Sequence, residues 1–258
     1  MIKNKINYTI SSDNIDEMYL KLKKRAPVKN FNLVLKPSSI NEKYISPYYK
    51  KHSGETAVIL GTGITLNQYK PIKNAIHLGV NSIVDYEKIN VDYYFVMDYS
   101  NGQTAFIKNQ DKISKYNAKL QKFYGKSNGN VPLSWPTGWG RGIPDKFFDK
   151  TVKPFETVKF TGDFYVPPID LGKYCFGLPI STIFMPIQFA LYAGFQKIYL
   201  VGCDCEGPNF KYKNHVNTVG VGLKQTFVYL REFVKLIYPD VEIKVINPVG
   251  LKNIFPSY

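Results

Sequence analysis

From Thr56 onward, short apolar runs alternate with stretches of helical periodicity. Apolar runs of about 4–8 residues between turn residues are typical of buried strands, and apolar spacings of three and four residues indicate helices. The pattern predicts strands at 56–60, 74–80, 93–97, 197–202 and 241–246, and helices at 104–122, 181–194 and 223–238. Residues 123–180, rich in Gly and Pro and containing both Trp residues, are expected to form irregular loops over one edge of the sheet.

Buried strands separated by helices predict the α/β fold class, with a single Rossmann-like, mainly parallel sheet and helices on both faces. We place this nucleotide-sugar-binding domain at 56–258. Residues 1–55 differ in pattern, and we expect them to form an N-terminal extension with a capped amphipathic helix at 12–25, a strand at 31–35 and a polar, tyrosine-rich stretch. This extension either packs on the main domain or serves as a partner-binding arm.

The 258-residue chain has a formal net charge of +14, which favours anionic partners such as nucleotides, acidic glycans or a membrane face. The basic residues are spread out, and no RNA-binding or zinc-finger signature accompanies them, so nucleic acid is disfavoured as a partner. A lysine-rich surface without a specific role explains the charge equally well. Peripheral contact at the inner membrane face is compatible with this charge, and a homo-oligomer is a further open alternative.

Three cysteines, Cys175, Cys203 and Cys205, form no disulfide framework. The amino terminus lacks the apolar core of a signal peptide, and no apolar run reaches about 18 residues. We therefore expect a cytoplasmic protein.

Gly61, Thr62 and Gly63 follow the first predicted strand and precede a helix-like segment. Glycines in such a turn let the backbone approach a phosphate, while a helix start offers free N–H groups to an anion. The third glycine of the dinucleotide fingerprint is missing, because position 66 is Leu. A plain tight turn is an equal alternative.

Asn81 occupies the position, about 20 residues past the first glycine, where an NAD site carries Asp or Glu. An amide can bind ribose or a base edge without placing a negative charge there. This disfavours a nicotinamide dehydrogenase and favours another kind of nucleotide. A strand-end Asn that closes its own turn is the alternative.

Further polar residues are expected at the ends of later strands, where ligands bind in open α/β sheets. Asp98 follows the third strand, and Asp204 follows the strand at 197–202. Ser181 or Thr182 is expected to cap the next helix, where either hydroxyl could also bind a phosphate. A lone Asp is not the paired carboxylate arrangement of a magnesium–diphosphate site, so we expect no metal.

His215 is the best candidate for a general base among only three histidines, because it lies in a polar loop beside the expected cleft. A solvated loop histidine without a role is the alternative.

Four blocks in this order resemble the bacterial sialyltransferases of the lipooligosaccharide type and the related domain of motility-accessory-factor and archaeal pterin-diphosphokinase-like proteins. The blocks are AVILGTG at 57–63, HLGVN at 77–81, ALYAGFQKIYLVGCD at 190–204 and INP at 246–248. The third is the most specific. The resemblance covers about 56–255, with the middle poorly matched.

The resemblance implies a sialyltransferase-like GT-A variant of the fold, in which the glycine turn and Asn81 hold the nucleotide. It implies that Ser181 and Thr182 meet the phosphate or the sugar carboxylate, and that the loop histidine, His215, deprotonates the acceptor hydroxyl. Tyr212 corresponds to one of two tyrosines on the departing phosphate, but Glu206 stands near the place of the other. The family's Gly-Pro-Ser continuation is changed to Gly63-Ile64-Thr65, a second departure from the pattern of the CMP-sialic acid enzymes.

The leading hypothesis is a metal-independent, inverting glycosyltransferase that needs no cofactor beyond its nucleotide-sugar donor. Its acceptor would be an anionic surface glycan or a lipid-linked sugar, as in lipopolysaccharide biosynthesis. One alternative is a pterin-type diphosphokinase that uses Mg²⁺ through Asp98 or Asp204. Another is a non-catalytic module that binds a nucleotide or nucleic acid.

Overall fold

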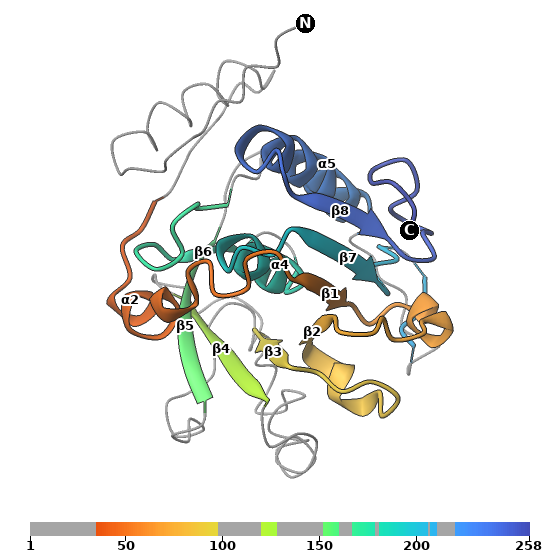
Figure 1. The fold of residues 1–258 in the computed structure, drawn as a ribbon, viewed down its shortest axis with the longest axis horizontal. Coiled ribbons are helices and arrows are strands. Elements are labelled where there is room, and N and C mark those ends of the chain that lie inside the picture. The colour runs from red at the N-terminus through yellow and green to blue at the C-terminus, as the bar shows by residue number, and fades with distance from the viewer. Residues whose placement is uncertain are drawn as a thin grey trace, which may run out of the picture.

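The computed structural model describes residues 35–97, 120–127, 152–159, 167–178, 181–205, 207–210 and 220–258. Eight strands form one sheet in the order β6-β5-β4-β3-β2-β1-β7-β8, and all seven neighbouring pairs are parallel (Figure 1). The strands are β1 Thr56–Leu60, β2 Ile76–Val80, β3 Tyr93–Val96, β4 Gln121–Ser127, β5 Val152–Lys159, β6 Phe176–Leu178, β7 Lys197–Val201 and β8 Glu242–Val245. The expected α/β fold with a parallel, Rossmann-like sheet is confirmed.

Helices and 3₁₀ turns cover the two faces of this sheet. The α-helices α4 (Phe184–Tyr192) and α5 (Gly220–Ile237) pack on one face, in the same hydrophobic cluster as Ile59 and Phe95. The 3₁₀ helices η2 (Ile64–Gln68) and η3 (Asn81–Asp85) pack on the other, with Val58 and Val96.

The strands are apolar on both faces because both are covered. In β1, the last four residues are fully buried, and they alternate between the two clusters. α4 is likewise buried along its whole length. The removal of apolar surface from water is the main stabilising contribution to such a three-layer arrangement. It contributes about 25 cal/mol for each Å² of apolar surface that is buried.

The region 123–180 differs from its expected loop structure. The part of it that the structure describes contains most of β4 and all of β5 and β6. The predicted helix at 104–122 is also wrong at its end, because Gln121 and Lys122 already belong to β4, whereas 104–119 lie outside the described residues.

Pro154 in β5 is one reason that the sequence misled here, since proline is rare in central strands. In the structure β6 pairs only with residues 157–159 of β5. Pro154 therefore lies where β5 has β4 on one side and no β6 on the other, as in an edge strand.

Residues 35–55 run along the edge at which the parallel strands begin, which we call the amino edge (Figure 1). They form α2 (Ser39–Tyr44) and the 3₁₀ helix η1 (Ser46–Tyr48), and Ile45 and Tyr48 belong to the core cluster of the α4 face. This part of the extension packs on the main domain. The boundary between residues 55 and 56 stays a prediction, and the expected elements at 12–25 and 31–34 lie outside the described residues.

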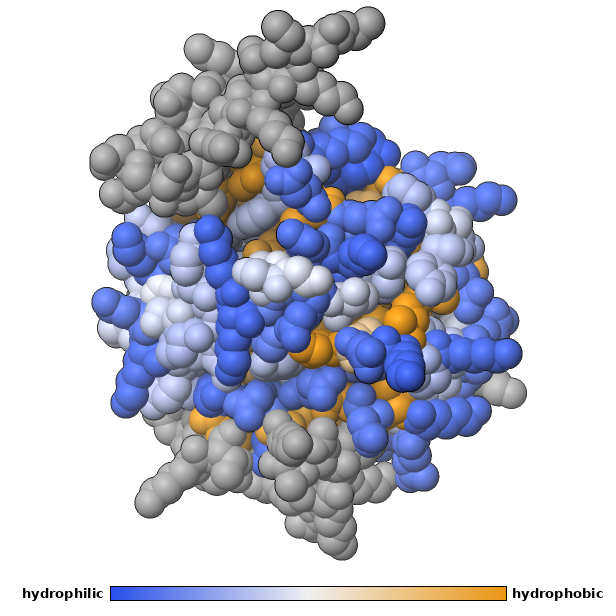
Figure 2. Space-filling model, in the orientation of Figure 1, coloured by the Kyte–Doolittle hydropathy of each residue, from blue (hydrophilic) through white to orange (hydrophobic). Residues whose placement is uncertain are grey.

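The face of the molecule in Figure 2 is mostly hydrophilic, and the hydrophobic side chains visible on it lie in small separate areas. Within the described residues, no helix combines enough length with enough apolar character to traverse a bilayer.

Candidate functional site

The carboxyl edge of the sheet, where the parallel strands end, brings together most of the predicted site residues. β1 lies between β2 and β7, with Leu60 in register with Gly79 on one side and with Val201 on the other. The chain leaves β1 towards β2 and returns on its other side as β7, so the topological switch point lies between β1 and β7. Ligands of open α/β sheets bind at such a point.

The glycine turn packs directly against the loop that follows β7. The Gly61 N–H donates to the carbonyl oxygen of Val201 and the Gly63 N–H to that of Gly202, both at 2.8 Å. A Cβ atom at Gly63 would lie 2.7 Å from the Gly202 carbonyl oxygen and 2.6 Å from Cγ of Asp204. The close approach of the two loops thus requires glycine at position 63 without any ligand. Thr62 lies between the two glycines, and its carbonyl accepts from the Phe210 N–H at 2.9 Å.

Asp204 fixes the start of η2. Its side chain is buried, with an exposed fraction of 5%, and Oδ2 accepts from the Thr65 N–H at 3.0 Å. Oδ1 accepts from the Thr65 hydroxyl. The carboxylate therefore occupies the place at this helix start where the sequence predicted a phosphate, and Asp204 caps a helix 139 residues earlier in the chain.

Asn81 and Thr182 are brought into contact. Nδ2 of Asn81, the residue directly after β2, lies 3.4 Å from Oγ1 of Thr182, which precedes α4. The backbone of Asn81 has φ = 46°, which Asn tolerates better than most residues, and its carbonyl accepts from the Tyr94 hydroxyl at 2.6 Å. The contact joins two of the predicted nucleotide-binding residues from segments 101 positions apart.

α4 follows β6 and precedes β7 in the chain, and both strands belong to the parallel sheet. The helix therefore runs antiparallel to the strands, and it begins at their carboxyl edge. Its N-cap position is Ile183, without a capping side chain, so the expected N-cap at Ser181 or Thr182 is wrong. Both residues instead form a turn before the helix. Ser181 Oγ accepts from the Ile183 N–H at 3.4 Å, and the carbonyl of Thr182 accepts from the Met185 N–H at 2.9 Å.

Three predicted site residues, Asp98, Tyr212 and His215, lie outside the described residues, as does Glu206. Their roles stay predictions. In the described ranges, no three His, Cys, Asp or Glu side chains come together as metal ligands would.

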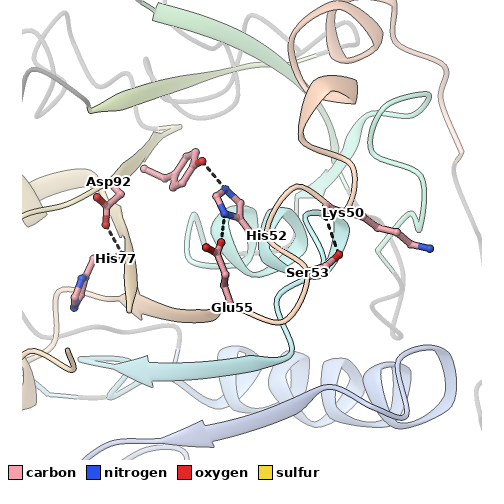
Figure 3. A network of polar contacts seen from close by, with 7 residues as sticks. Lys50, His52, Ser53, Glu55, His77 and Asp92 are labelled. Carbon is pink, nitrogen blue, oxygen red and sulfur yellow. Dashed lines mark hydrogen bonds and ion pairs between the residues drawn. The ribbon is translucent and has the colours of Figure 1, made fainter. Parts of the chain in front are cut away.

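Two histidines of the described chain, His52 and His77, lie away from the carboxyl edge (Figure 3). His52 Nδ1 is 2.5 Å from Oε2 of Glu55, and its Nε2 is 2.6 Å from the hydroxyl of Tyr93. Because Glu55 directly precedes β1 and Tyr93 begins β3, this chain of polar contacts belongs to the amino edge. Burial raises the pKa of Tyr93. The network ties residues 52–55 to the sheet.

His77 lies within β2 on the face of the sheet that η2 and η3 cover. Its ring Nε2 is 3.0 Å from the Tyr69 hydroxyl, and its backbone N–H donates to Oδ2 of Asp92 at 2.9 Å (Figure 3). Burial lowers the pKa of His77, against smaller opposing effects of Asp92 and the Ala75 backbone. The ring is therefore held neutral inside the fold.

The cysteines are free and buried. Cys203 lies next to Asp204 in the loop after β7, and burial is the largest of the causes that raise the pKa of its thiol. A protonated, buried thiol is a weak nucleophile, so Cys203 serves packing.

No protein-family model and no curated protein matches the sequence. Among solved structures, the chain is similar to the MAf glycosyltransferase from Magnetospirillum magneticum AMB-1, with 12% sequence identity and a TM-score of 0.42. The alignment covers 83% of this chain and 37% of that chain, so this chain spans well under half the length of that structure. The fold assignment given above rests on the strand order and pairing of this chain itself.

Proposed function

We propose that this protein is a glycosyltransferase that binds the nucleotide of an activated sugar at the carboxyl edge of its sheet. The observation that carries the proposal is the contact between the Asn81 amide and the Thr182 hydroxyl, 3.4 Å apart. An uncharged amide and a hydroxyl at the end of β2 and the start of α4 can donate to phosphate or ribose oxygens without repelling them. The resemblance of the sequence blocks around Asn81 and Asp204 to bacterial sialyltransferases supports a sugar nucleotide in particular.

In the proposal, seven of the predicted nucleotide-binding residues fall into two groups. Gly61, Gly63, Thr65 and Asp204 hold the loops after β1 and β7 together: the two glycines donate to the carbonyls of Val201 and Gly202, and Thr65 donates to Asp204. In the proposal these residues build the floor of the site, and the nucleotide contacts Asn81, Thr182 and Ser181. A phosphate placed at the start of η2 would instead face the Asp204 carboxylate, which disfavours it.

The proposed reaction is an inverting transfer. The acceptor hydroxyl attacks the anomeric carbon of the sugar, the bond from that carbon to the phosphate oxygen breaks, and the acceptor proton passes to His215. The nucleoside monophosphate leaves with the electron pair, and Tyr212 donates a hydrogen bond to its phosphate. Positioning, general base catalysis and leaving-group stabilisation each contribute on the order of a few kcal/mol to such a step. The proposal also names the donor, which is a sialic-acid-type sugar on CMP, and the acceptor, which is an anionic glycan or a lipid-linked sugar. It includes independence from metal.

A thermal-shift panel of CMP, UDP, GDP and ATP, each with and without Mg²⁺, tests this proposal. A stabilising ligand raises the melting temperature because it binds only the folded state. We expect CMP to stabilise the protein without metal. Stabilisation by ATP that requires Mg²⁺ would replace the proposal with a diphosphokinase, for which Asp98 is the better ligand because Asp204 is bonded to Thr65. Binding of DNA or RNA without any nucleotide would instead leave a nucleic-acid-binding module.

A further inference from the structure

Two lysines of the amino edge converge on the same aromatic ring. Nζ of Lys51 lies 4.9 Å and Nζ of Lys153 lies 5.0 Å from the ring centre of Tyr48. Lys153 comes from the beginning of β5, and Lys51 from the turn after η1, where its N–H donates to the Tyr48 carbonyl at 3.1 Å. The two ammonium groups are therefore no more than about 10 Å apart, which is about one Debye length at an ionic strength of about 0.1 M.

Lys153 is held in place by neutral partners. Its ammonium group donates to the Tyr48 hydroxyl and, at 2.6 Å, to Oε1 of Gln121. The Tyr48 hydroxyl donates in turn to the same Gln121 oxygen at 3.1 Å. A lysine ammonium has three N–H donors, so two are used here and one is left for a ligand.

Neither lysine has a counter-ion in the described part of the chain. The acidic residues that follow the two lysines in the sequence have other partners. Glu55, after Lys51, contacts His52, and Glu156, after Lys153, accepts from the Ser38 hydroxyl at 2.6 Å. No carboxylate among the described residues forms an ion pair with Lys51 or Lys153. Two like charges that share one ring without a carboxylate repel each other, and a bound anion would relieve that repulsion.

We propose that Lys51 and Lys153, both held beside Tyr48, form a binding site for one phosphoryl group at the amino edge of the sheet. The free donor of Lys153 and the exposed ammonium of Lys51 would bind separate phosphate oxygens, since charge-assisted hydrogen bonds to phosphate are the strong ones. The phosphoryl group belongs either to a free phosphate compound or to a lipid headgroup. The site lies at the opposite edge of the sheet from Asn81 and Thr182, so it does not rest on the proposed function.

Two probes distinguish the sources of the phosphoryl group. The first is inorganic pyrophosphate, titrated into the full-length protein by calorimetry. The second is co-sedimentation with phosphatidylcholine vesicles that contain or lack phosphatidylglycerol. Each is repeated with Lys51→Ala, Lys51→Arg and Lys153→Met. The control is Lys235→Ala, which removes the same charge from an exposed lysine in α5 that pairs with Glu232 at 3.5 Å.

We expect Lys51→Ala and Lys153→Met to weaken binding about tenfold, the usual loss for one hydrogen bond to a charged group, whereas Lys51→Arg and Lys235→Ala retain it. Loss in the pyrophosphate titration assigns a free phosphate compound, and loss in the vesicle assay assigns a headgroup. Lys51 is exposed, so its variants remain informative if Lys153→Met does not fold. The proposal is overturned if neither probe binds, or if Lys51→Ala binds as the wild type or no more weakly than Lys235→Ala. Nucleotide stabilisation at the other edge is measured separately and does not depend on this outcome.

Discussion

The carboxylate of Asp204 accepts a hydrogen bond of 3.0 Å from the backbone N–H of Thr65, and a second from the hydroxyl of the same residue. This relationship joins the loop after β7 to the helix turn after β1. It makes the start of η2 a structural junction, and for this reason the proposed function assigns the nucleotide to Asn81 and the start of α4 instead.

Replacing Asp204 with Asn should destabilise the protein. The amide keeps the shape of the side chain, and it can still accept from the Thr65 N–H and donate to the Thr65 hydroxyl, but both hydrogen bonds lose the charged acceptor that strengthens them. We expect the free energy of unfolding to fall by about 1–3 kcal/mol, measured by urea denaturation. Asp240→Asn, at an exposed position, is the matched control. An equal effect of the two substitutions would show that the Thr65 bonds contribute nothing.

Gly63→Ala should also destabilise the fold, because its Cβ would lie 2.6 Å from Asp204 Cγ and 2.7 Å from the Gly202 carbonyl oxygen. The cost of forcing such an atom into a packed site is about 1–3 kcal/mol. The denaturation midpoint of Gly63→Ala is compared with that of Thr62→Ala, which adds no atom in the same turn. A wild-type midpoint for Gly63→Ala would contradict the tight packing of the two loops.

Asn81→Asp tests the nucleotide site without changing side-chain shape. Both residues tolerate a positive φ, but the carboxylate would repel a phosphate, so we expect nucleotide affinity to fall about tenfold or more. Asn74→Asp is a close control, because Asn74 is exposed and has φ = 61°. Isothermal titration with the nucleotide that stabilises the wild type measures the effect. Unchanged affinity in Asn81→Asp would remove Asn81 from the site.

His215→Ala should abolish turnover while nucleotide binding persists, if His215 is the general base. Loss of a general base lowers the rate by about 10²–10⁴-fold. The measurements are sugar transfer to an acceptor and nucleotide affinity in the same preparation. Full activity in this variant would exclude His215 from the role.

Stability should depend on pH through His77. Burial lowers its pKa below the ordinary value of 6.5, so between the lowered value and 6.5 the unfolded chain binds more protons than the folded one. The stabilising effect of the neutral ring is therefore fully present above pH 6.5 and is lost as the pH falls towards the folded pKa. Denaturation at a series of pH values should give a flatter profile for His77→Gln than for the wild type. Parallel profiles would contradict this assignment.

The sequence predicted the central strands because their signals are local. β1 has the predicted bounds, Thr56–Leu60, and β2, β3, β7 and β8 lie within the predicted ranges. A buried parallel strand needs only a short apolar run between turn residues, and the sequence shows this directly. β4 and β5 were missed because they contain lysines and, in β5, Pro154, and β6 was missed because it has only three residues. The strand structure of all three comes from pairing with neighbours.

The sequence predicted which residues lie at the carboxyl edge, but not which of them contact one another. Once the strands are parallel, residues that follow them must meet at one edge, so Gly63, Asn81 and Asp204 could be expected there. The sequence could not show that Asp204 would bond Thr65, nor that Asn81 would meet Thr182. Those contacts join segments more than 100 residues apart, and no local pattern records them.

The apolar periodicity of this chain thus determined its fold class, the order of its central elements and the edge at which polar residues gather. The tertiary structure alone decided which of those residues bind each other, and it alone brought Lys51 and Lys153 to the Tyr48 ring. The physical reason is that burial depends on the hydrophobicity of each residue along the chain, whereas a hydrogen bond or a charge cluster depends on distances of a few ångströms that only the folded backbone fixes.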